Sequence, residues 1–203
     1  STVPAIVDVT TGAVVNNDYH ALTTELALGF KDFISPDAPD IYPEELRADI
    51  DALNVIIYAD FNLAVNLAAL VTNQKDYEYY YDRIFARLDW LEERLSKQRY
   101  LMGDTITDSD IRIFPTLARF DLVFYQKYLV NKKRLVDYPN LWNYAKDLYS
   151  NPAFGGTTDF DSMRKRFYYV DHTPFEDLPR LVPKGPDDSI WLEPNDRAEK
   201  FGK

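Results

Sequence analysis

The sequence predicts a mainly α-helical protein that begins with a short β-β-α segment. Apolar residues recur every three or four positions over two long stretches, which begin near Pro43 and Tyr77. This spacing places them on one face of a helix. A helix-start signal, Thr107-Asp108-Ser109-Asp110, introduces a third helix that is apolar on nearly every side. Glycine is scarce, at 7 of 203 residues, which disfavours a fold built on tight turns.

The first 34 residues predict a hairpin followed by a short helix. Two apolar runs, Val3-Pro4-Ala5-Ile6-Val7 and Ala13-Val14-Val15, flank the turn signal Thr10-Thr11-Gly12. Asn16-Asn17-Asp18 offers N-capping side chains for a helix that reaches about Phe30. Residues 35–42 are rich in proline and aspartate, and we interpret them as a linker.

Residues 43–172 predict an all-helical domain. The first apolar face comprises Leu46, Ile50, Leu53, Ile57 and Phe61, and the second comprises Tyr77, Tyr81, Ile84, Leu88, Leu91 and Leu95. The loop between these two helices is short, so they should pack antiparallel. Thr107 and Asp110 form the capping pair of the third helix, Pro139 opens a fourth, and a fifth spans about Phe160 to Tyr168. Residues 173–203 are rich in proline, and we expect an extended tail that lies on the helices.

Composition excludes several classes of function. The net charge of −10 leaves no basic face for nucleic acid or for an anionic membrane surface. No uninterrupted apolar run is long enough to span a membrane. The absence of cysteine excludes disulfides, thiolate metal sites and a cysteine nucleophile within these residues, and the two histidines lack ligand spacing. No secretory signal is visible, which leaves the cytoplasm as the expected compartment.

Two motifs resemble the glutathione transferase superfamily. Gly103-Asp104-Thr105-Ile106-Thr107-Asp108-Ser109-Asp110-Ile111 resembles the start of the central helix of its C-terminal domain, and Tyr138-Pro139-Asn140-Leu141-Trp142 resembles the start of the next helix. The segments Lys97-Gln98-Arg99-Tyr100-Leu101, Asp110-Ile111-Arg112-Ile113-Phe114, Arg119-Phe120-Asp121 and Asp159-Phe160-Asp161 narrow the resemblance to the xi class, the glutathionyl-hydroquinone reductases, which are similar to the omega class. The resemblance implies a helical bundle preceded by the last part of a thioredoxin-like domain.

The resemblance also implies a chemistry, with glutathione as co-substrate. In the xi class a cysteine at the start of the first helix attacks the sulfur of a glutathionyl-hydroquinone, and a second glutathione resolves the mixed disulfide. This chain begins at the strand that carries the cis-proline, so we expect the nucleophilic cysteine upstream of Ser1. By itself the chain should then be inactive. The resemblance further implies a homodimer.

Five residues correspond to the glutathione side of the family's site. Val3, before the cis-proline Pro4, would offer backbone hydrogen bonds to the cysteinyl unit of glutathione. Asn17, Asp18 and Tyr19 occupy the helix start that binds the γ-glutamyl group, with Tyr19 where the family usually has serine. Each has a structural alternative: an ordinary edge strand at Pro4, and N-capping by Asn17 or Asp18.

The acceptor pocket of the xi class carries tyrosines at three positions, and the corresponding residues here are Asn66, Phe124 and Tyr168. Tyr169 replaces Tyr168 in this set if the loop near Pro152 shifts the register. The structural alternative for Tyr168 is a half-buried ring with its hydroxyl in water. We also expect Arg112, Arg119 and Asp121 to form a structural ion-pair cluster, because unpaired charge on a buried helix is unfavourable.

The sequence therefore predicts a glutathione-dependent thiol transferase that acts on a small aromatic or quinol-type acceptor. Two alternatives stay open. One is a non-catalytic binding or assembly module, because this helical domain also serves as an interaction scaffold. The other is a glutathione transferase with an altered, more apolar acceptor pocket.

Overall fold

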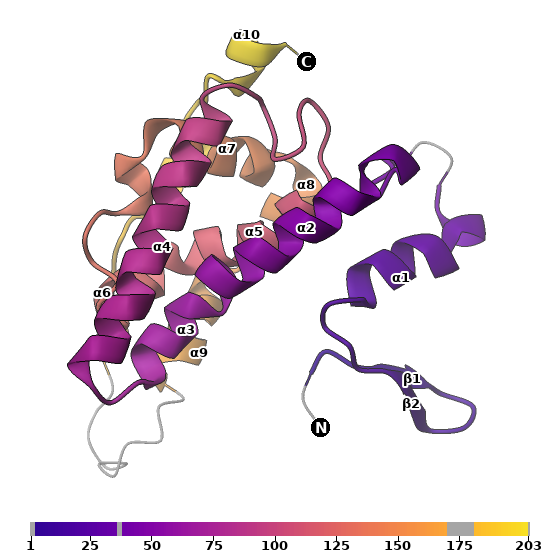
Figure 1. The fold of residues 1–203 in the computed structure, drawn as a ribbon, viewed down its shortest axis with the longest axis horizontal. Coiled ribbons are helices and arrows are strands. Elements are labelled where there is room, and N and C mark those ends of the chain that lie inside the picture. Colours follow the sequence, from indigo (N-terminus) through magenta and orange to yellow (C-terminus); the bar gives the residue numbers. More distant parts are fainter. Residues whose placement is uncertain (1–2, 36–37, 170–180, 203) are drawn as a thin grey trace.

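The computed structural model describes residues 3–35, 38–169 and 181–202. An N-terminal segment, which comprises a hairpin and α1 (Leu22–Gly29), lies beside a larger domain of packed helices (Figure 1). The helical domain begins with α2 (Arg47–Ile57), whose outer side faces this segment. The predicted fold class, a helical bundle after a β-β-α segment, is confirmed.

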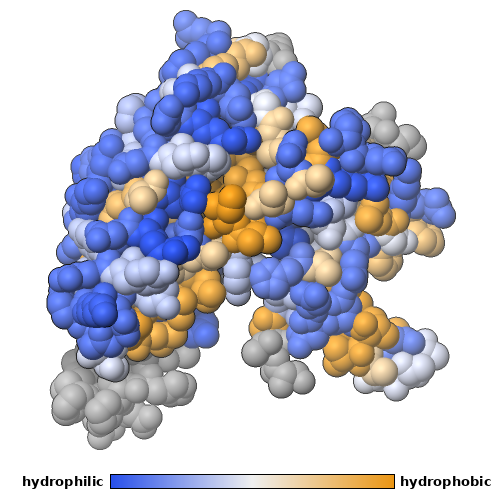
Figure 2. Space-filling model, viewed as in Figure 1, coloured by the Kyte–Doolittle hydropathy of each residue, from blue (hydrophilic) through white to orange (hydrophobic). Residues whose placement is uncertain are grey.

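The hairpin joins β1 (Ile6–Asp8) to β2 (Ala13–Asn16) in antiparallel register, with Val7 opposite Val14. Gly12 adopts a φ of 68° in the turn, a region where glycine is unstrained. Most valines of the hairpin are exposed, and apolar atoms are visible over it in Figure 2. Among the described residues no further strand pairs with either edge of this two-stranded sheet.

Helix α1 begins later than the capping residues suggest. Asn16 ends β2, and Asp18 precedes a turn over residues 19–21 in which its Oδ1 accepts from the backbone N–H of His20 at 2.8 Å; regular helix starts only at Leu22. A short 3₁₀ turn, η1 (Lys31–Phe33), follows α1.

The first long helix of the bundle is interrupted. A 3₁₀ turn η2 (Glu44–Leu46) leads into α2, a π-helical turn η3 (Tyr58–Asn62) follows, and α3 (Ala64–Leu70) completes the run. The chain then reverses, and α4 (Gln74–Leu95) runs back against α3. Most members of both predicted apolar faces are buried: Ile50, Leu53, Ile57 and Phe61 from the first, and Ile84, Leu88, Leu91 and Leu95 from the second. Leu46, Tyr77 and Tyr81 are partly buried.

The run Glu44–Leu70 is also long and apolar enough to cross a membrane by length and composition alone. Asn54, Asp60 and Asn62 interrupt it, which is why the sequence contains no unbroken apolar stretch. Here the run packs against α4 and α5. The core face of a bundle helix therefore accounts for the buried part of this run, while Val55, Ile56 and Leu70 are exposed.

Helix α5 (Asp108–Arg119) lies at the centre of the bundle and contacts α2, η3 and α7 (Pro139–Ser150). Its first turn is unusual because Thr107, Asp108, Ser109 and Asp110 are all fully buried. A second π-helical turn, η4 (Phe120–Phe124), extends α5 towards the short α6 (Tyr125–Lys127).

The Asp110 carboxylate holds four groups together. Oδ2 accepts from the backbone N–H of Thr107 at 2.8 Å and from its hydroxyl at 3.0 Å. Oδ1 accepts from Leu101 N–H at 3.0 Å and from the Tyr144 hydroxyl at 2.7 Å, which reaches across from α7. Burial raises the pKa of Asp110, and these hydrogen bonds oppose that rise. The predicted cap thus joins α5, the loop before it and α7.

The end of the chain covers the bundle. A 3₁₀ turn η5 (Leu135–Asp137) precedes α7, which α8 (Pro152–Gly155) and α9 (Phe160–Tyr169) follow. The prediction of a wholly extended tail is wrong for η6 (Asp188–Leu192) and α10 (Arg197–Phe201). Trp191 is buried against Trp142 and Phe160, and Arg197 donates to the carbonyls of Leu95, Gln98 and Arg99. Residues 173–180 of the predicted tail lie outside the described residues.

We expect Asp110→Ala to lower the free energy of unfolding by about 3 kcal/mol, because it leaves four buried donors without an acceptor. Urea denaturation would measure this loss. Asp104→Ala, in the exposed loop before the helix, is the control and should stay within about 0.5 kcal/mol of the parent protein. Equal stabilities of the two variants would contradict the role of the Asp110 carboxylate.

Candidate functional site

A hollow of about 360 Å³ lies where the N-terminal segment meets the helical domain. We call it the Tyr19 hollow. Its lining comes from the turn before α1, from η3 and α3, from α5 and η4, and from α9. The lining residues are Tyr19, Tyr58, Asn62, Leu63, Asn66, Pro115, Thr116, Arg119, Phe124 and Phe167.

Three of the residues expected from the family resemblance meet in this hollow: Tyr19, Asn66 and Phe124. Tyr19 comes from the expected glutathione side, whereas Asn66 and Phe124 come from the expected acceptor wall. One amide proton of Asn66 is used by its own helix, since Nδ2 donates to the Asn62 carbonyl at 2.9 Å. Phe124 is buried and packs edge-to-face against Phe167, with 6.1 Å between ring centroids.

The other expected glutathione residues lie on the exposed side of the N-terminal segment. The Val3–Pro4 peptide bond is cis, as the resemblance implies, and Val3 is 91% exposed. Asn17 Nδ2 donates to the Pro4 carbonyl at 2.7 Å and so ties the two strands' ends together. Asp18 is exposed and caps the turn before α1.

Tyr168 and Tyr169 lie outside the lining of the Tyr19 hollow. The Tyr168 hydroxyl donates to the Leu122 carbonyl at 3.3 Å, and burial raises its pKa. Tyr169 is 48% exposed. On α9 it is Phe167, one residue before the expected pair, that reaches the hollow.

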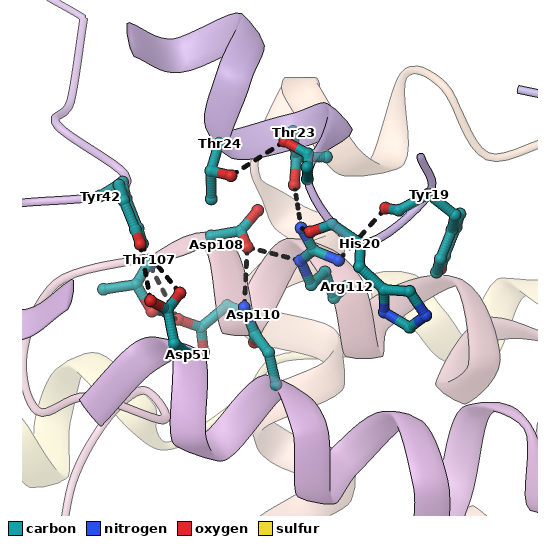
Figure 3. Close-up of polar contacts among 12 residues, drawn as sticks. Tyr19, His20, Thr23, Thr24, Tyr42, Asp51, Thr107, Asp108, Asp110 and Arg112 are labelled. Carbon is teal, nitrogen blue, oxygen red and sulfur yellow. Dashed lines mark hydrogen bonds and ion pairs between the residues drawn. The ribbon is translucent and has the colours of Figure 1, made fainter. Parts of the chain in front are cut away.

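Arg112 joins the N-terminal segment to α5 (Figure 3). Its Nη2 donates to the His20 carbonyl at 2.7 Å and to the Thr23 hydroxyl at 2.6 Å. On the other side Nε pairs with Asp108 Oδ2 at 2.5 Å. Asp108 is fully buried and also accepts from Asn54 Nδ2 at 2.8 Å, so this pair is anchored in the bundle. Arg112 therefore fixes the position of Tyr19 relative to the helical wall.

The expected ion-pair cluster of Arg112, Arg119 and Asp121 does not form. Arg112 pairs with Asp108 instead. Asp121 accepts from the backbone N–H groups of Leu135 at 2.6 Å and Val136 at 3.2 Å, which caps η5. Burial raises the pKa of Asp121. Arg119 is left without a carboxylate among the described residues, and it faces the Tyr19 hollow.

Sequence reasoning missed Tyr58, Asn62 and Arg119 as lining residues. Tyr58 and Asn62 begin and end the π-helical turn η3, where the register of side chains departs from the helical period. No periodicity argument anticipates such a turn. The ring of Tyr58 packs against Tyr19 and His20, at centroid distances of 5.8 Å and 4.4 Å.

A larger hollow, of about 730 Å³, lies between α1, residues 38–42 and Ile111. Its lining contains none of the residues that the family resemblance singles out, and apolar side chains such as Leu26 and Ile34 dominate it. We therefore place the candidate site at the Tyr19 hollow, where residues of both expected sides come together.

Comparisons with known proteins show which proteins the chain is similar to. Residues 74–147 match the family "Glutathione S-transferase, C-terminal domain". The chain is 35% identical to the glutathionyl-hydroquinone reductase PcpF of Sphingobium chlorophenolicum, over 91% of this chain and 58% of that protein. It is 33% identical to the glutathionyl-hydroquinone reductase YqjG of Escherichia coli, over 99% of this chain and 60% of that protein. The chain thus spans about three fifths of the length of these relatives.

Solved structures are similar over nearly the whole chain. A glutathione transferase from Gordonia bronchialis is 44% identical, with a TM-score of 0.92 over 100% of this chain and 62% of that chain. A protein from Corynebacterium glutamicum described as a glutathione S-transferase candidate is 39% identical, with a TM-score of 0.92 over 99% of this chain and 67% of that chain. Glutathione-bound YqjG has a TM-score of 0.89 at 32% identity, over 98% of this chain and 64% of that chain.

We expect Thr23→Val to loosen the N-terminal segment from α5, because Arg112 loses one of its acceptors there. Hydrogen exchange of the amides in Leu22–Gly29 should accelerate by about fivefold, the equivalent of about 1 kcal/mol. Mass spectrometry of peptides from α1 and α4 would measure the change, and α4 should not respond.

Thr24→Val is the matched control for this prediction. The Thr24 hydroxyl donates to the Ala21 carbonyl at 2.9 Å, within the turn that leads into α1, and makes no bond to α5. Equal acceleration in both variants would show that Arg112 does not hold the segment.

Proposed function

Because the chain belongs to the glutathione transferase family, we propose that it forms part of the glutathione site and the acceptor wall of a glutathione-dependent thiol transferase. The substrates in this proposal are glutathionyl-hydroquinones or related aromatic conjugates. Support for the substrate class comes from the reductases PcpF and YqjG, to which the chain is similar. Support for glutathione comes from the glutathione-bound structure of YqjG.

One observation carries the proposal: Tyr19 lines the same hollow as Asn66 and Phe124. A glutathionyl conjugate has a peptide part and an aromatic part joined by one sulfur. A site for it must therefore place a glutathione-binding segment next to an aromatic-lined wall. Here Asp18 and Tyr19 are adjacent in sequence, and the aromatic wall of Phe124 and Phe167 lines the hollow that Tyr19 enters.

The proposed reaction needs a thiolate, and the 203 residues contain no cysteine. We propose that a cysteine outside these residues attacks the sulfur of the conjugate. The carbon–sulfur bond then breaks, the ring carbon takes a proton, and a mixed disulfide forms. A second glutathione attacks that disulfide, which releases glutathione disulfide and restores the thiolate.

Two tyrosines are suited to assist this cleavage. As the carbon–sulfur bond breaks, negative charge develops on the ring and its oxygens, and a hydroxyl donor placed there stabilises the transition state. Asn66 and Phe124 stand where the xi class carries tyrosines, but Tyr19 and Tyr58 line the same hollow. We propose that their hydroxyls supply this donor function.

The lack of a cysteine also favours a second candidate, a binding or assembly module without catalysis. In that case the Tyr19 hollow binds an aromatic compound and no disulfide is exchanged. The first proposal includes a homodimer, which the family resemblance implies. It also includes a cytoplasmic location, which rests on the sequence.

The first proposal can be tested on the complete product of the gene that encodes this chain. Incubation with a glutathionyl-hydroquinone and excess glutathione should release free hydroquinone and glutathione disulfide in equal amounts, measured by liquid chromatography. Tyr58→Phe should lower kcat by about tenfold or more with little change in KM, because the donor acts in the transition state.

Tyr79→Phe is the control, since Tyr79 lies exposed on α4 and accepts from Arg83 at 2.8 Å. Binding of the conjugate without any release of hydroquinone would refute the transferase and favour the binding module.

A further inference from the structure

Arg119 occupies a position that the proposed chemistry does not use. It is the last residue of α5, directly before the π-helical turn η4. Its side chain lines the Tyr19 hollow and also a neighbouring hollow of about 290 Å³ between α5, α8 and α9. The guanidinium therefore lies at the junction of two hollows on the acceptor side of the site.

No carboxylate pairs with Arg119 in the part of the chain that the structure describes. Among the described residues its side chain makes one hydrogen bond, from Nη1 to the Pro115 carbonyl at 2.6 Å, within its own helix. A guanidinium carries five N–H donors, so most of them are left for other partners. By contrast, Arg99 is bound by both oxygens of Asp147, and Arg112 pairs with Asp108.

Four other arginines of the described residues lack a carboxylate. Arg166 is exposed, and Arg47 donates from Nε to the Tyr42 carbonyl at 3.2 Å and lies over the Tyr42 ring. The remaining two are satisfied by backbone carbonyls. Arg94 donates through Nε and Nη2 to the Leu101 carbonyl, and Arg197 donates to three carbonyls at the end of α4 and just after it. Arg119 has no such set of acceptors. Burial lowers its pKa, which means that its charged form has lost hydration without a compensating anion. Tyr19 opposes this shift, and an anion supplied by a ligand would offset the lost hydration further.

We propose that Arg119 binds an anionic substituent of the acceptor, so that the preferred acceptors are aromatic rings that carry a carboxylate. This inference rests on the proposed function and names the substrate class of the same site. A carboxylate accepts two parallel hydrogen bonds from a guanidinium, and the rings of Phe124 and Phe167 provide apolar surface for the aromatic part.

Glutathione itself carries carboxylates and is the competing source of the anion. The position of Arg119 favours the acceptor. It belongs to the helical wall with Pro115, Thr116 and Phe124, whereas four of the five expected glutathione residues, Val3, Pro4, Asn17 and Asp18, do not line the hollow.

The test compares a dihydroxybenzoate with the dihydroxybenzamide of the same substitution pattern, which differs only in its charge. Isothermal titration of the complete protein should show tighter binding of the benzoate by about tenfold or more, as expected for a charge-assisted pair. Arg119→Met should abolish this preference, and Arg119→Lys should restore part of it. Arg166→Met, which removes an exposed charge on α9, should leave the preference intact.

Three results separate the possibilities. Equal affinity of the parent protein for the two compounds would overturn the inference, even if hydroquinone release is observed. A loss of glutathione affinity in Arg119→Met, with benzoate binding unchanged, would assign the arginine to glutathione and also overturn it. Arg119-dependent benzoate binding without hydroquinone release would refute the transferase while the anion site stands.

A folding control accompanies these titrations. Arg119→Met should unfold at the same urea concentration as the parent protein or a higher one, because it removes a cation without a counterion. A large loss of stability would instead assign Arg119 a structural role and count against the inference.

Discussion

The buried first turn of α5 is the constraint on which the rest of the structure depends. Asp108 and Asp110 are both fully buried there, and each needs several donors to be tolerated. Asp110 accepts hydrogen bonds from Leu101 and Tyr144, which fixes the preceding loop and α7. The Asp108 carboxylate accepts a hydrogen bond from Asn54 and pairs with Arg112, and its backbone N–H donates to the Ile41 carbonyl of the linker at 2.8 Å. Asp108 and Asp110 thereby bind four separate parts of the chain at one helix end: the loop at Leu101, α7, α2 and the linker.

Helix α5 itself connects this buried first turn to the candidate site. One turn after Asp108, Arg112 reaches out to the backbone of His20 and the hydroxyl of Thr23. Pro115 and Thr116, one turn further along, and Arg119, two turns further along, line the Tyr19 hollow. A single rigid helix therefore sets both the position of the N-terminal segment and the wall opposite which an acceptor would lie. The placement of Tyr19 follows from the cap, because Arg112 can hold His20 only while Asp108 holds Arg112.

Features with a local physical cause could be predicted from the sequence. The capping pair Thr107 and Asp110, the two apolar faces and the hairpin turn at Gly12 each follow from spacing or backbone preference over a few residues. The π-helical turns could not, since η3 and η4 arise from packing and leave no mark in the hydrophobic period. That is why Tyr58 and Asn62, the first and last residues of η3, were missed as lining residues. The partner of Arg112 was also missed: Asp121, nine residues further along, was expected, whereas Asp108, four residues earlier on the same helix, forms the ion pair.

The expected ion-pair cluster of Arg112, Arg119 and Asp121 does not form, and this leaves Arg119 without a carboxylate among the described residues. Arg112 pairs with Asp108 and not with Asp121. The expected pairing with Asp121 is therefore wrong for Arg112. It fails for Arg119 because Asp121, two residues later, lies on η4 and is committed to the backbone of η5. Arg112 thus has a carboxylate partner on its own helix, whereas Arg119 has none among the described residues. The arginine with an internal partner holds two parts of the protein together, whereas the one without a partner faces the space that a ligand would fill.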